Sequence, residues 1–366
     1  MTKKQKIILS TITILILGLL TAFREELTAD TVRMNLHEIR TVVMPPMYDH
    51  GDNPIHVADV VIYDISGTNP MFGETVISWY FDGDLNGEEP HVTFETLTPG
   101  KELIASVGIN DSFIEFEPIT DQGRGTAVIT IGVGEASRTV FVRIYDLSLR
   151  LIALEFDDGP SRYTERTVIA LNDAGVSASF YLTGRNFHDI THEFVGVEIY
   201  PEVALFTFNS GHHIGNHTYS HPWLVEHSGG FAEPFPEGQY IPWWQYSEDE
   251  VVYQVQRASE AMYVVLGVVP TYYAPTYLWN HFNHYVTNIG KTISFRRFAI
   301  DSGDWWWEST AEDIVEIVLT APDGSTIILH DIYEKTAEAV EVIVNSLEAQ
   351  EIQFVTGYEL DMILGR

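Results

Sequence analysis

The hydrophobic periodicity of the chain changes at about residue 150, and this change limits the folds that it can adopt. Residues 40–145 contain seven short apolar runs of the length and spacing of β-strands, separated by turn residues and without a helical period. From Arg150 onward, strand-like runs alternate with helical stretches. The sequence therefore predicts an all-β sandwich over residues 39–146, followed by an α/β domain over residues 147–366.

The α/β part repeats a strand–helix unit. The strand-like runs are Leu151–Phe156, Val176–Leu182, His213–His217, Thr271–Ala274, Phe295–Ile300, Ser325–His330 and Ile352–Val355. One helix is predicted from Ser247 to Gly267, and another begins at Ser309. The repeated units fit a distorted seven-stranded (β/α) barrel better than two domains, and in such barrels the chemistry lies in the loops that follow the strands.

Titratable residues follow the first and third of these strands. Asp157 and Asp158 end the first strand, and two adjacent carboxylates disfavour each other unless a cation lies between them. His217 and His221 follow the third strand, four residues apart, which on a helical turn would place both rings on one face. With Asp158 they would form a metal site of two histidines and one carboxylate. The alternative is a pair of exposed or capping histidines.

Other polar and aromatic groups follow the later strands. These are Tyr272–Tyr277, then Asp301, Asp304 and three tryptophans, and finally His330 and Asp331. We assign only surface or supporting roles to His212, His213, His281 and His284, and a hairpin rather than a calcium loop to Asp82–Thr93. Trp243 and Trp244 could serve packing or stack on sugar rings.

Five motifs after residue 150 resemble, in order, those of the polysaccharide deacetylases of carbohydrate esterase family four. The family's T-F-D-D-G-P corresponds to Glu155–Pro160, H-[ST]-x-x-H to His217–His221, R-x-P-Y to Tyr273–Thr276, D-x-x-D-W to Asp301–Trp305 and L-x-H to Ile328–His330. The earlier β-runs are similar in pattern to bacterial immunoglobulin-like surface modules. The resemblance implies a hydrolase with a divalent metal, zinc in the first instance, with cobalt, nickel or manganese as alternatives.

The resemblance also implies roles for individual residues. Asp157 corresponds to the catalytic base, His330 to the general acid and Asp304 to the carboxylate that keeps His330 protonatable. Asp158, His217 and His221 correspond to the metal ligands. Tyr273, Pro275, Thr276 and Trp305 correspond to the substrate-binding positions, with the Thr276 N–H at the oxyanion and Trp305 as one wall of the acetyl pocket.

The third motif departs from the family pattern. Tyr273 stands where the family has the arginine that orients the base, and Thr276 stands where it has a tyrosine. Tyr273 could donate one hydrogen bond to Asp157 but supplies no charge, and Arg296 or Arg297 could take over that role. Glu155 in place of threonine and Ile328 in place of leucine are milder changes.

The N-terminus and the net charge bear on location and partners. Three lysines precede the uncharged run Ile7–Phe23, which predicts an export signal or membrane anchor over residues 1–23, followed by a linker over 24–38. The formal net charge of −32 argues against nucleic acid as a partner. The absence of cysteine leaves only histidine, aspartate and glutamate to hold a metal. We expect a monomer that is secreted or at the cell surface, and that touches a membrane only through its N-terminal segment.

The resemblance implies removal of acetyl groups from an acetylated polysaccharide. The expected reaction is metal-dependent N-deacetylation of a cell-wall glycan of the N-acetylglucosamine type. The alternatives are an O-acetyl esterase acting on xylan, or a glycan-binding surface protein whose catalytic site has decayed. Because every candidate residue follows Leu147, the sequence also predicts that a fragment beginning there folds and acts alone.

Overall fold

The structure is a computed structural model. It describes residues 41–43, 47–65, 75–82, 87–110, 112–119, 121–188, 191–222, 233–234, 240–241, 248–278, 283–293, 299–346 and 348–365. The predicted segments 1–23 and 24–38, Trp243, Trp244, Arg296 and Arg297 lie outside these residues. Among the described helices, none has the length and apolar character needed to cross a bilayer.

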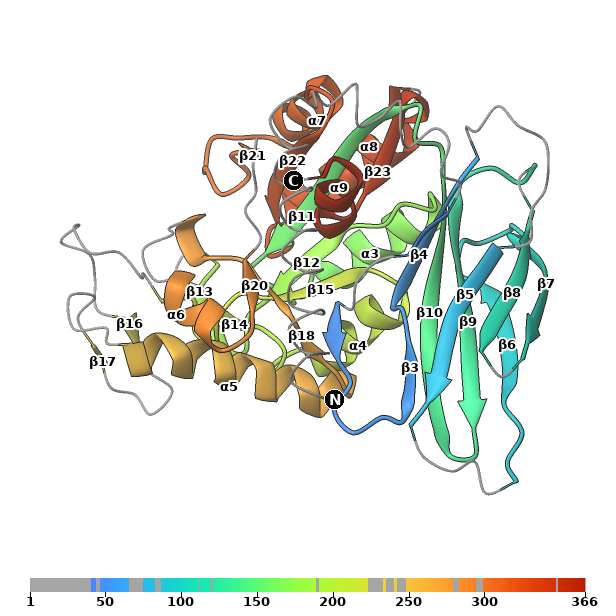
Figure 1. The fold of residues 1–366 in the computed structure, drawn as a ribbon. Coiled ribbons are helices and arrows are strands. Elements are labelled where there is room, and N and C mark those ends of the chain that lie inside the picture. The colour runs from blue at the N-terminus through green and yellow to red at the C-terminus, as the bar shows by residue number, and fades with distance from the viewer. Residues whose placement is uncertain are drawn as a thin grey trace, which may run out of the picture.

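Two β-sheets form the N-terminal part (Figure 1). One has the order β1 (Thr41–Val43), β4 (Val60–Asp64), β10 (Ala136–Tyr145), β9 (Gly125–Val133), β6 (His91–Thr96). The other has the order β3 (Ile55–Val57), β5 (Thr75–Phe81), β8 (Phe113–Pro118), β7 (Ile104–Ile109). Each of the seven predicted β-runs contains a strand. The pairing within these two sheets is antiparallel except between β4 and β10, which run parallel.

The central strands of the five-stranded sheet, β4, β10 and β9, are buried on both faces. Successive side chains of a strand point to opposite faces. The buried side chains that β10 directs to each of its two faces are apolar or form ion pairs. Val140, Val142 and Ile144 pack in one cluster with residues of the four-stranded sheet. Phe141 and Tyr145 pack in a second cluster with the α/β part of the chain. This sheet is therefore a middle layer, which explains why β9 and β10 read as nearly continuous apolar runs.

An eight-stranded sheet forms the centre of the α/β part. Its order is β20 (Thr292–Ile293), β19 (Tyr272–Tyr273), β15 (His213–Asn216), β12 (Ser179–Leu182), β11 (Arg150–Asp157), β22 (Ser325–His330), β21 (Ala299–Asp301), with β23 (Ile352–Val355) beside β11. The strand pairings within its described residues are parallel, as the repeated units predict. Each predicted strand region contains a strand, and β20 is an addition. Within the described residues β20 and β21 are end strands, so closure into a barrel stays a prediction.

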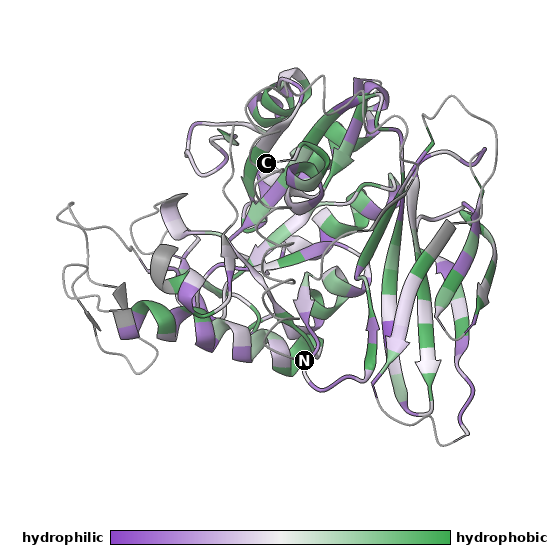
Figure 2. Ribbon diagram, in the orientation of Figure 1, coloured by the Kyte–Doolittle hydropathy of each residue, from purple (hydrophilic) through white to green (hydrophobic). Residues whose placement is uncertain are grey.

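The remaining elements cover this sheet or extend its loops. The helices are α3 (Thr164–Asp173), α4 (Pro201–Asn209), α5 (Glu248–Leu266), α6 (Asn283–Asn288), α7 (Ala311–Thr320), α8 (Glu334–Asn345) and α9 (Gly357–Ile363), with short 3₁₀ turns at Thr276–Leu278 and Glu348–Glu351. The short strand pairs are β13 (Asn186–His188) with β14 (Glu193–Val195), β16 (Glu233–Pro234) with β17 (Tyr240–Ile241), and β2 (Tyr48–Asp49) with β18 (Val269–Pro270). Helix α5 carries both hydrophobic and hydrophilic residues, as a helix with one buried face does (Figure 2).

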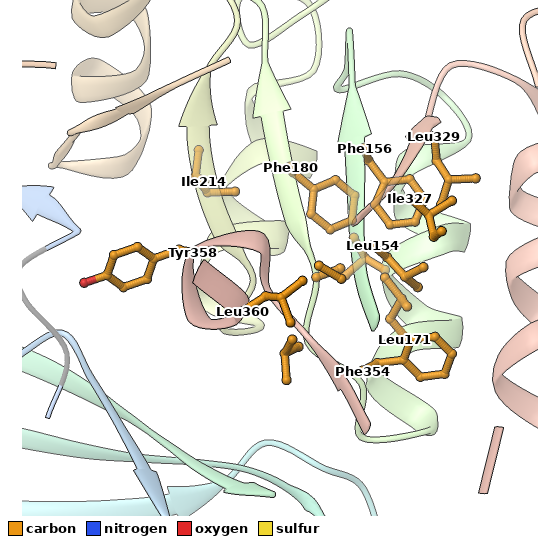
Figure 3. Close-up of a cluster of buried hydrophobic side chains, with 14 of the residues drawn as sticks. Leu154, Phe156, Leu171, Phe180, Ile214, Ile327, Leu329, Phe354, Tyr358 and Leu360 are labelled. Carbon is orange, nitrogen blue, oxygen red and sulfur yellow. The ribbon is translucent and has the colours of Figure 1, made fainter. Parts of the chain in front are cut away.

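Strand β11 lies at the centre of the α/β core. It pairs with β22 over residues 152–157, while β23 pairs with its first half and β12 with its last three residues. Its even-numbered side chains, Leu154 and Phe156, lie in the apolar cluster shown in Figure 3, where Phe156 stacks on Phe180 at a centroid distance of 4.8 Å. The odd-numbered side chains, which end with Asp157, point to the opposite face.

A buried ion pair joins the middle β-layer to the C-terminal helix α9. Arg143 Nε donates to Glu359 Oε1 (2.9 Å), and both side chains are fully buried. Tyr145 Oη donates to Glu359 Oε2 (2.8 Å), which also accepts from the N–H of Thr356 at the start of α9. Arg143 further donates to the carbonyl of Gly211. One carboxylate thus caps a helix and fastens two parts of the chain together.

This interface argues against the expectation that a fragment beginning at Leu147 is independent. Such a fragment loses both Arg143 and Tyr145, so the buried Glu359 carboxylate keeps only its capping contacts. A buried charge without its partner is strongly destabilising. We therefore expect the fragment to be less stable than the full chain.

Replacing Arg143 by methionine tests this interface. We expect the free energy of unfolding in urea to fall by about 3–5 kcal/mol, because Glu359 becomes an uncompensated buried charge. The double variant Arg143→Met/Glu359→Gln should recover part of that loss, since the neutral amide oxygen can still accept hydrogen bonds. An Arg143→Met protein within ~1 kcal/mol of the wild type would show that the pair contributes little.

Candidate active site

Asp157 and Asp158 stand at the carboxyl end of β11, and both are 4% exposed. The parallel register places Asp157 opposite His330 of β22. Asp158 follows the strand in the left-handed region, with φ at +75°. Its carbonyl accepts a hydrogen bond from Thr183 Oγ1 (2.9 Å). A non-glycine residue at such a φ costs energy and persists only where its surroundings hold it. Because the backbone leaves the extended conformation at Asp158, the Asp157 and Asp158 carboxylates point in different directions.

Asp158, His217 and His221 bring three donor atoms together. One nitrogen or oxygen of each lies within 4.8 Å of the others. Asp158 Oδ1 is 3.4 Å from His217 Nε2 and 3.0 Å from His221 Nε2. This oxygen is buried and, among the described residues, receives no hydrogen bond of ordinary geometry. The donor set and the converging lone pairs fit a divalent cation of the zinc type.

The backbone around His217 fixes the orientation of its ring. His217 Nδ1 lies 2.8 Å from the carbonyl oxygen of Ala274, which can only accept, so Nδ1 carries the proton and the lone pair of Nε2 is left for a metal ion. Asn216 supports this loop by accepting from the N–H of Thr218 and donating to the carbonyl of Val255.

The segment from His217 to His221 is not a helical turn, so that local expectation was wrong. Thr218 and His221 have φ values of +71° and +54°, which a right-handed helix cannot accommodate. The two rings nevertheless lie 5.1 Å apart between centroids. The loop brings them together through its bends instead of through helical spacing.

Charge explains the ionisation of Asp158. Burial alone would raise the pKa of this carboxyl, but the imidazoles of His221 and His217 hold the pKa well below its usual range. Asp157 is also close, with Oδ2 at 3.7 Å from His217 Nε2. The two carboxylates therefore share His217, and Asp158 also contacts His221.

His330 and Asp304 form a tight pair beside this cluster. His330 Nδ1 lies 2.7 Å from Asp304 Oδ1, and the N–H of His330 donates to Asp304 Oδ2 (2.7 Å). Thr336 Oγ1 donates to the same oxygen (2.7 Å). Burial lowers the pKa of His330, but the Asp304 carboxylate outweighs it and raises the pKa to about 10. His330 is thus held as a cation with Nδ1 occupied and Nε2 left to act.

The predicted substrate-binding residues lie on loops after neighbouring strands. Tyr273, in β19, is buried, and burial raises the pKa of its hydroxyl. Pro275 and Thr276 are also buried, and Thr276 Oγ1 donates to the carbonyl of Pro222 (2.8 Å). Trp305 is half exposed, and its Nε1 donates to the Asp301 carboxylate.

Three aromatic or histidine side chains at the site, His188, Tyr277 and Tyr333, were given no role from the sequence. His188, from the hairpin β13–β14, has Nε2 at 3.9 Å from Asp158 Oδ2 and 3.3 Å from Tyr333 Oη. Tyr277, with φ at +55°, lays its ring 4.6 Å from that of His221. These residues come from loops after different strands, and only the tertiary arrangement brings them to the cluster.

Asp331 lies directly behind the Asp158–Gly159 turn. A Cβ added at Gly159 would come within 2.2 Å of Asp331 Oδ2, so the close approach requires glycine at this position. Asp331 Oδ2 accepts from Thr164 Oγ1 (2.5 Å). Burial raises the pKa of Asp331 to about 7, and the neighbouring Asp158 and Asp157 add to this effect. The motif glycine is therefore explained by packing against a second acid.

Part of this chain is similar to known proteins. Residues 145–297 match the profile described as polysaccharide deacetylase. The chain is 26% identical over 219 residues to the peptidoglycan-N-acetylmuramic acid deacetylase PdaC of Bacillus subtilis, covering 60% of this chain and 40% of that protein. It is 27% identical over 211 residues to the peptidoglycan-N-acetylglucosamine deacetylase PgdA of Listeria monocytogenes, covering 57% and 38%.

A solved structure of PdaC is similar to 59% of this chain and 91% of its own, with 26% identity and a TM-score of 0.47. The chain spans about 40% of the length of the curated relatives named above. The profile match includes Asp157, Asp158, His217 and His221, whereas Asp304 and His330 lie beyond its end. Residues 145–297 of the chain are thus similar to the polysaccharide deacetylase family.

Proposed function

We propose that this chain is an exported, metal-dependent deacetylase that removes N-acetyl groups from a cell-wall glycan of the N-acetylglucosamine type. Asp158, His217 and His221 hold the metal, Asp157 is the base, and His330 is the acid. Asp304 positions His330. The Thr276 N–H stabilises the oxyanion, while Tyr273, Pro275 and Trp305 shape the acetyl pocket. We also propose the domain division at residues 146 and 147, a barrel closed by the α/β sheet, and an export segment at residues 1–23.

One observation supports this proposal more than any other. The three converging donor atoms and the Asp304–His330 pair stand beyond the carboxyl ends of strands in one parallel sheet. A chain that only binds glycan has no need for a histidine held as a cation by a buried carboxylate. The arrangement therefore favours catalysis over a decayed site.

The residues of this site divide the work of amide hydrolysis between them. A divalent ion in this donor set would act as a Lewis acid toward the acetyl carbonyl. Asp157, which is not among the three converging donors, accepts the proton of the attacking water. His330 then gives a proton to the departing nitrogen as the C–N bond breaks, which releases acetate and an amine. An amide needs this proton because an amine anion is a very poor leaving group.

The names of the relatives support an N-acetyl substrate. PdaC and PgdA are named for deacetylation of peptidoglycan sugars, and another relative is a chitin deacetylase of Pestalotiopsis. A further relative is a bifunctional xylanase/deacetylase of Pseudobutyrivibrio xylanivorans. Acetate release from N-acetylglucosamine oligomers, peptidoglycan and acetylxylan, measured side by side, separates these classes. Release from acetylxylan alone would replace the proposal by the O-acetyl esterase.

Removal of the metal is the first test of the site. We expect a chelator to abolish acetate release, and zinc, cobalt, nickel or manganese to restore it to different degrees. His217→Ala and Asp158→Ala should each lower bound metal, measured by elemental analysis, together with turnover. Asp157→Asn is the matched control, because it should keep the metal and lose nearly all turnover. Full activity of the metal-free protein would contradict the assignment of Asp158, His217 and His221 as ligands of a catalytic metal.

The pairing of His330 with Asp304 predicts a change in the pH profile. Activity requires protonated His330, so it should fall as pH rises through the pKa of His330. Asp304→Asn removes the charge that raises this pKa, so the alkaline limb of kcat/KM should move to lower pH. Thr336→Val, which removes a neutral contact to Asp304, serves as the comparison and should shift the limb less. If the alkaline limb of kcat/KM does not move in Asp304→Asn, that limb reports the titration of a group other than His330.

The acid role of His330 also predicts a difference between substrates. His330→Ala should reduce turnover of an N-acetyl amide far more than that of 4-nitrophenyl acetate, whose leaving group needs little protonation. Initial rates on both substrates, at matched saturation, measure the ratio. Equal losses on the two substrates would mean that His330 positions the substrate and does not donate the proton.

A further inference from the structure

Three consecutive tryptophans follow strand β21, and two of them have no part in the site described above. Trp305, Trp306 and Trp307 are 44%, 46% and 76% exposed. A tryptophan as open as Trp307 contributes little to any core. Exposed contiguous apolar surface on a soluble domain marks a place where something binds, and aromatic rings supply the largest contact area for the least conformational entropy.

The turn that carries these rings is held firmly by hydrogen bonds. The Trp306 N–H donates to the Gly303 carbonyl (2.9 Å), and Ser309 Oγ donates to the same carbonyl (2.8 Å). Lys335 Nζ, from α8, donates to the carbonyl of Trp306 (2.6 Å) and to Ser309 Oγ (2.7 Å). The rings are thus presented by a pre-organised turn, which lowers the entropy lost on binding.

The same turn lies directly against the catalytic pair. Asp304, which lies in this turn, is the carboxylate that pairs with His330. The parallel register puts Asp301 level with Ile328 of β22, two residues before His330. Trp306 and Trp307 follow Asp304 by two and three residues, so they belong to the loop that supplies the carboxylate of the catalytic pair.

The faces of these rings are open to a ligand. Trp305 and Trp306 meet edge to face at 84°, with centroids 5.8 Å apart, and Trp306 and Trp307 are inclined at 41° and 6.2 Å. None of the rings covers its neighbour by stacking. A pyranose ring carries C–H groups on its faces and can pack flat on an indole, whereas its hydroxyl groups remain in water.

We propose that Trp306 and Trp307 form a glycan platform, a binding site for sugar rings of the same polymer whose acetyl group is hydrolysed. The inference rests on the proposed function and extends it: the platform makes the enzyme selective for chains over single sugars. The acids around it, Asp301, Glu308, Glu312 and Asp313, would repel an anionic bilayer and do not hinder a neutral glycan. The polymer is therefore favoured over a membrane as the occupant.

The test compares long and short substrates. For Trp307→Ala, the ratio of kcat/KM on an N-acetylglucosamine hexamer to that on the monomer should fall about fivefold or more, chiefly through KM on the hexamer. Trp307→Phe should restore most of the ratio because it keeps a flat ring. Tyr263→Ala, which removes a 51% exposed aromatic from α5 on another surface, is the matched control. An unchanged ratio, or equal losses on both substrates, would overturn the platform.

Two further measurements separate this inference from the proposed function. If the wild type releases no acetate from any substrate, the proposed function fails. Retardation of the protein in gels containing soluble glycol chitin then tests whether the platform binds glycan. Loss of retardation in Trp307→Ala then supports the platform, and equal retardation overturns it. Sedimentation with zwitterionic and anionic vesicles tests the membrane: binding by the wild type that Trp307→Ala loses, with an unchanged hexamer ratio, would assign the rings to a bilayer.

Discussion

Strand β11 is hydrogen-bonded along both edges and buried along nearly its whole length, and the geometry of the site depends on this placement. Its register with β22 sets Asp157 opposite His330, and its register with β12 sets the height of the loop that carries His217 through β15. A slip of one residue would exchange Phe156 and Asp157 between faces. The stacking of Phe156 on Phe180 in the apolar layer opposes such a slip. Core packing and site geometry are thus two results of one strand alignment.

Electrostatics then decides how the acids at this end of the sheet behave. Asp158, with two imidazoles beside it, is held ionised, whereas Asp331 behind the same turn is pushed toward the neutral acid. Asp304 forms an ion pair with one cation, His330. Neighbouring carboxyl groups with different partners can therefore carry different tasks. Four of the five described non-glycine residues in the left-handed region, Asp158, Thr218, His221 and Tyr277, lie at this cluster, where surrounding hydrogen bonds hold the strained backbone.

The β part of the chain is bound to the α/β part more closely than a separate module would be. Its five-stranded sheet faces one core on each side, and Arg143 crosses the boundary to the carboxylate that caps α9. Because β11 follows β10 after only a few residues, a shift of the middle layer would be transmitted to the strand that carries Asp157. The sequence pattern separates the two parts by their periodicity, which reports local structure and contains no information on what packs between them.

The sequence by itself determined the strands and helices with long apolar periods, the parallel arrangement that repeated strand–helix units require, and the set of residues from Asp157 to His330 that resemble a family. These follow from local spacing, which one chain displays. Only the tertiary structure decided what depends on distant partners: the bent path from His217 to His221, the parallel pairing of β4 with β10, and the positions of His188, Tyr277 and Tyr333 at the site. The burial of Arg143 against Glu359 belongs with them, because 216 residues separate the two in the chain and only folding brings the charges together.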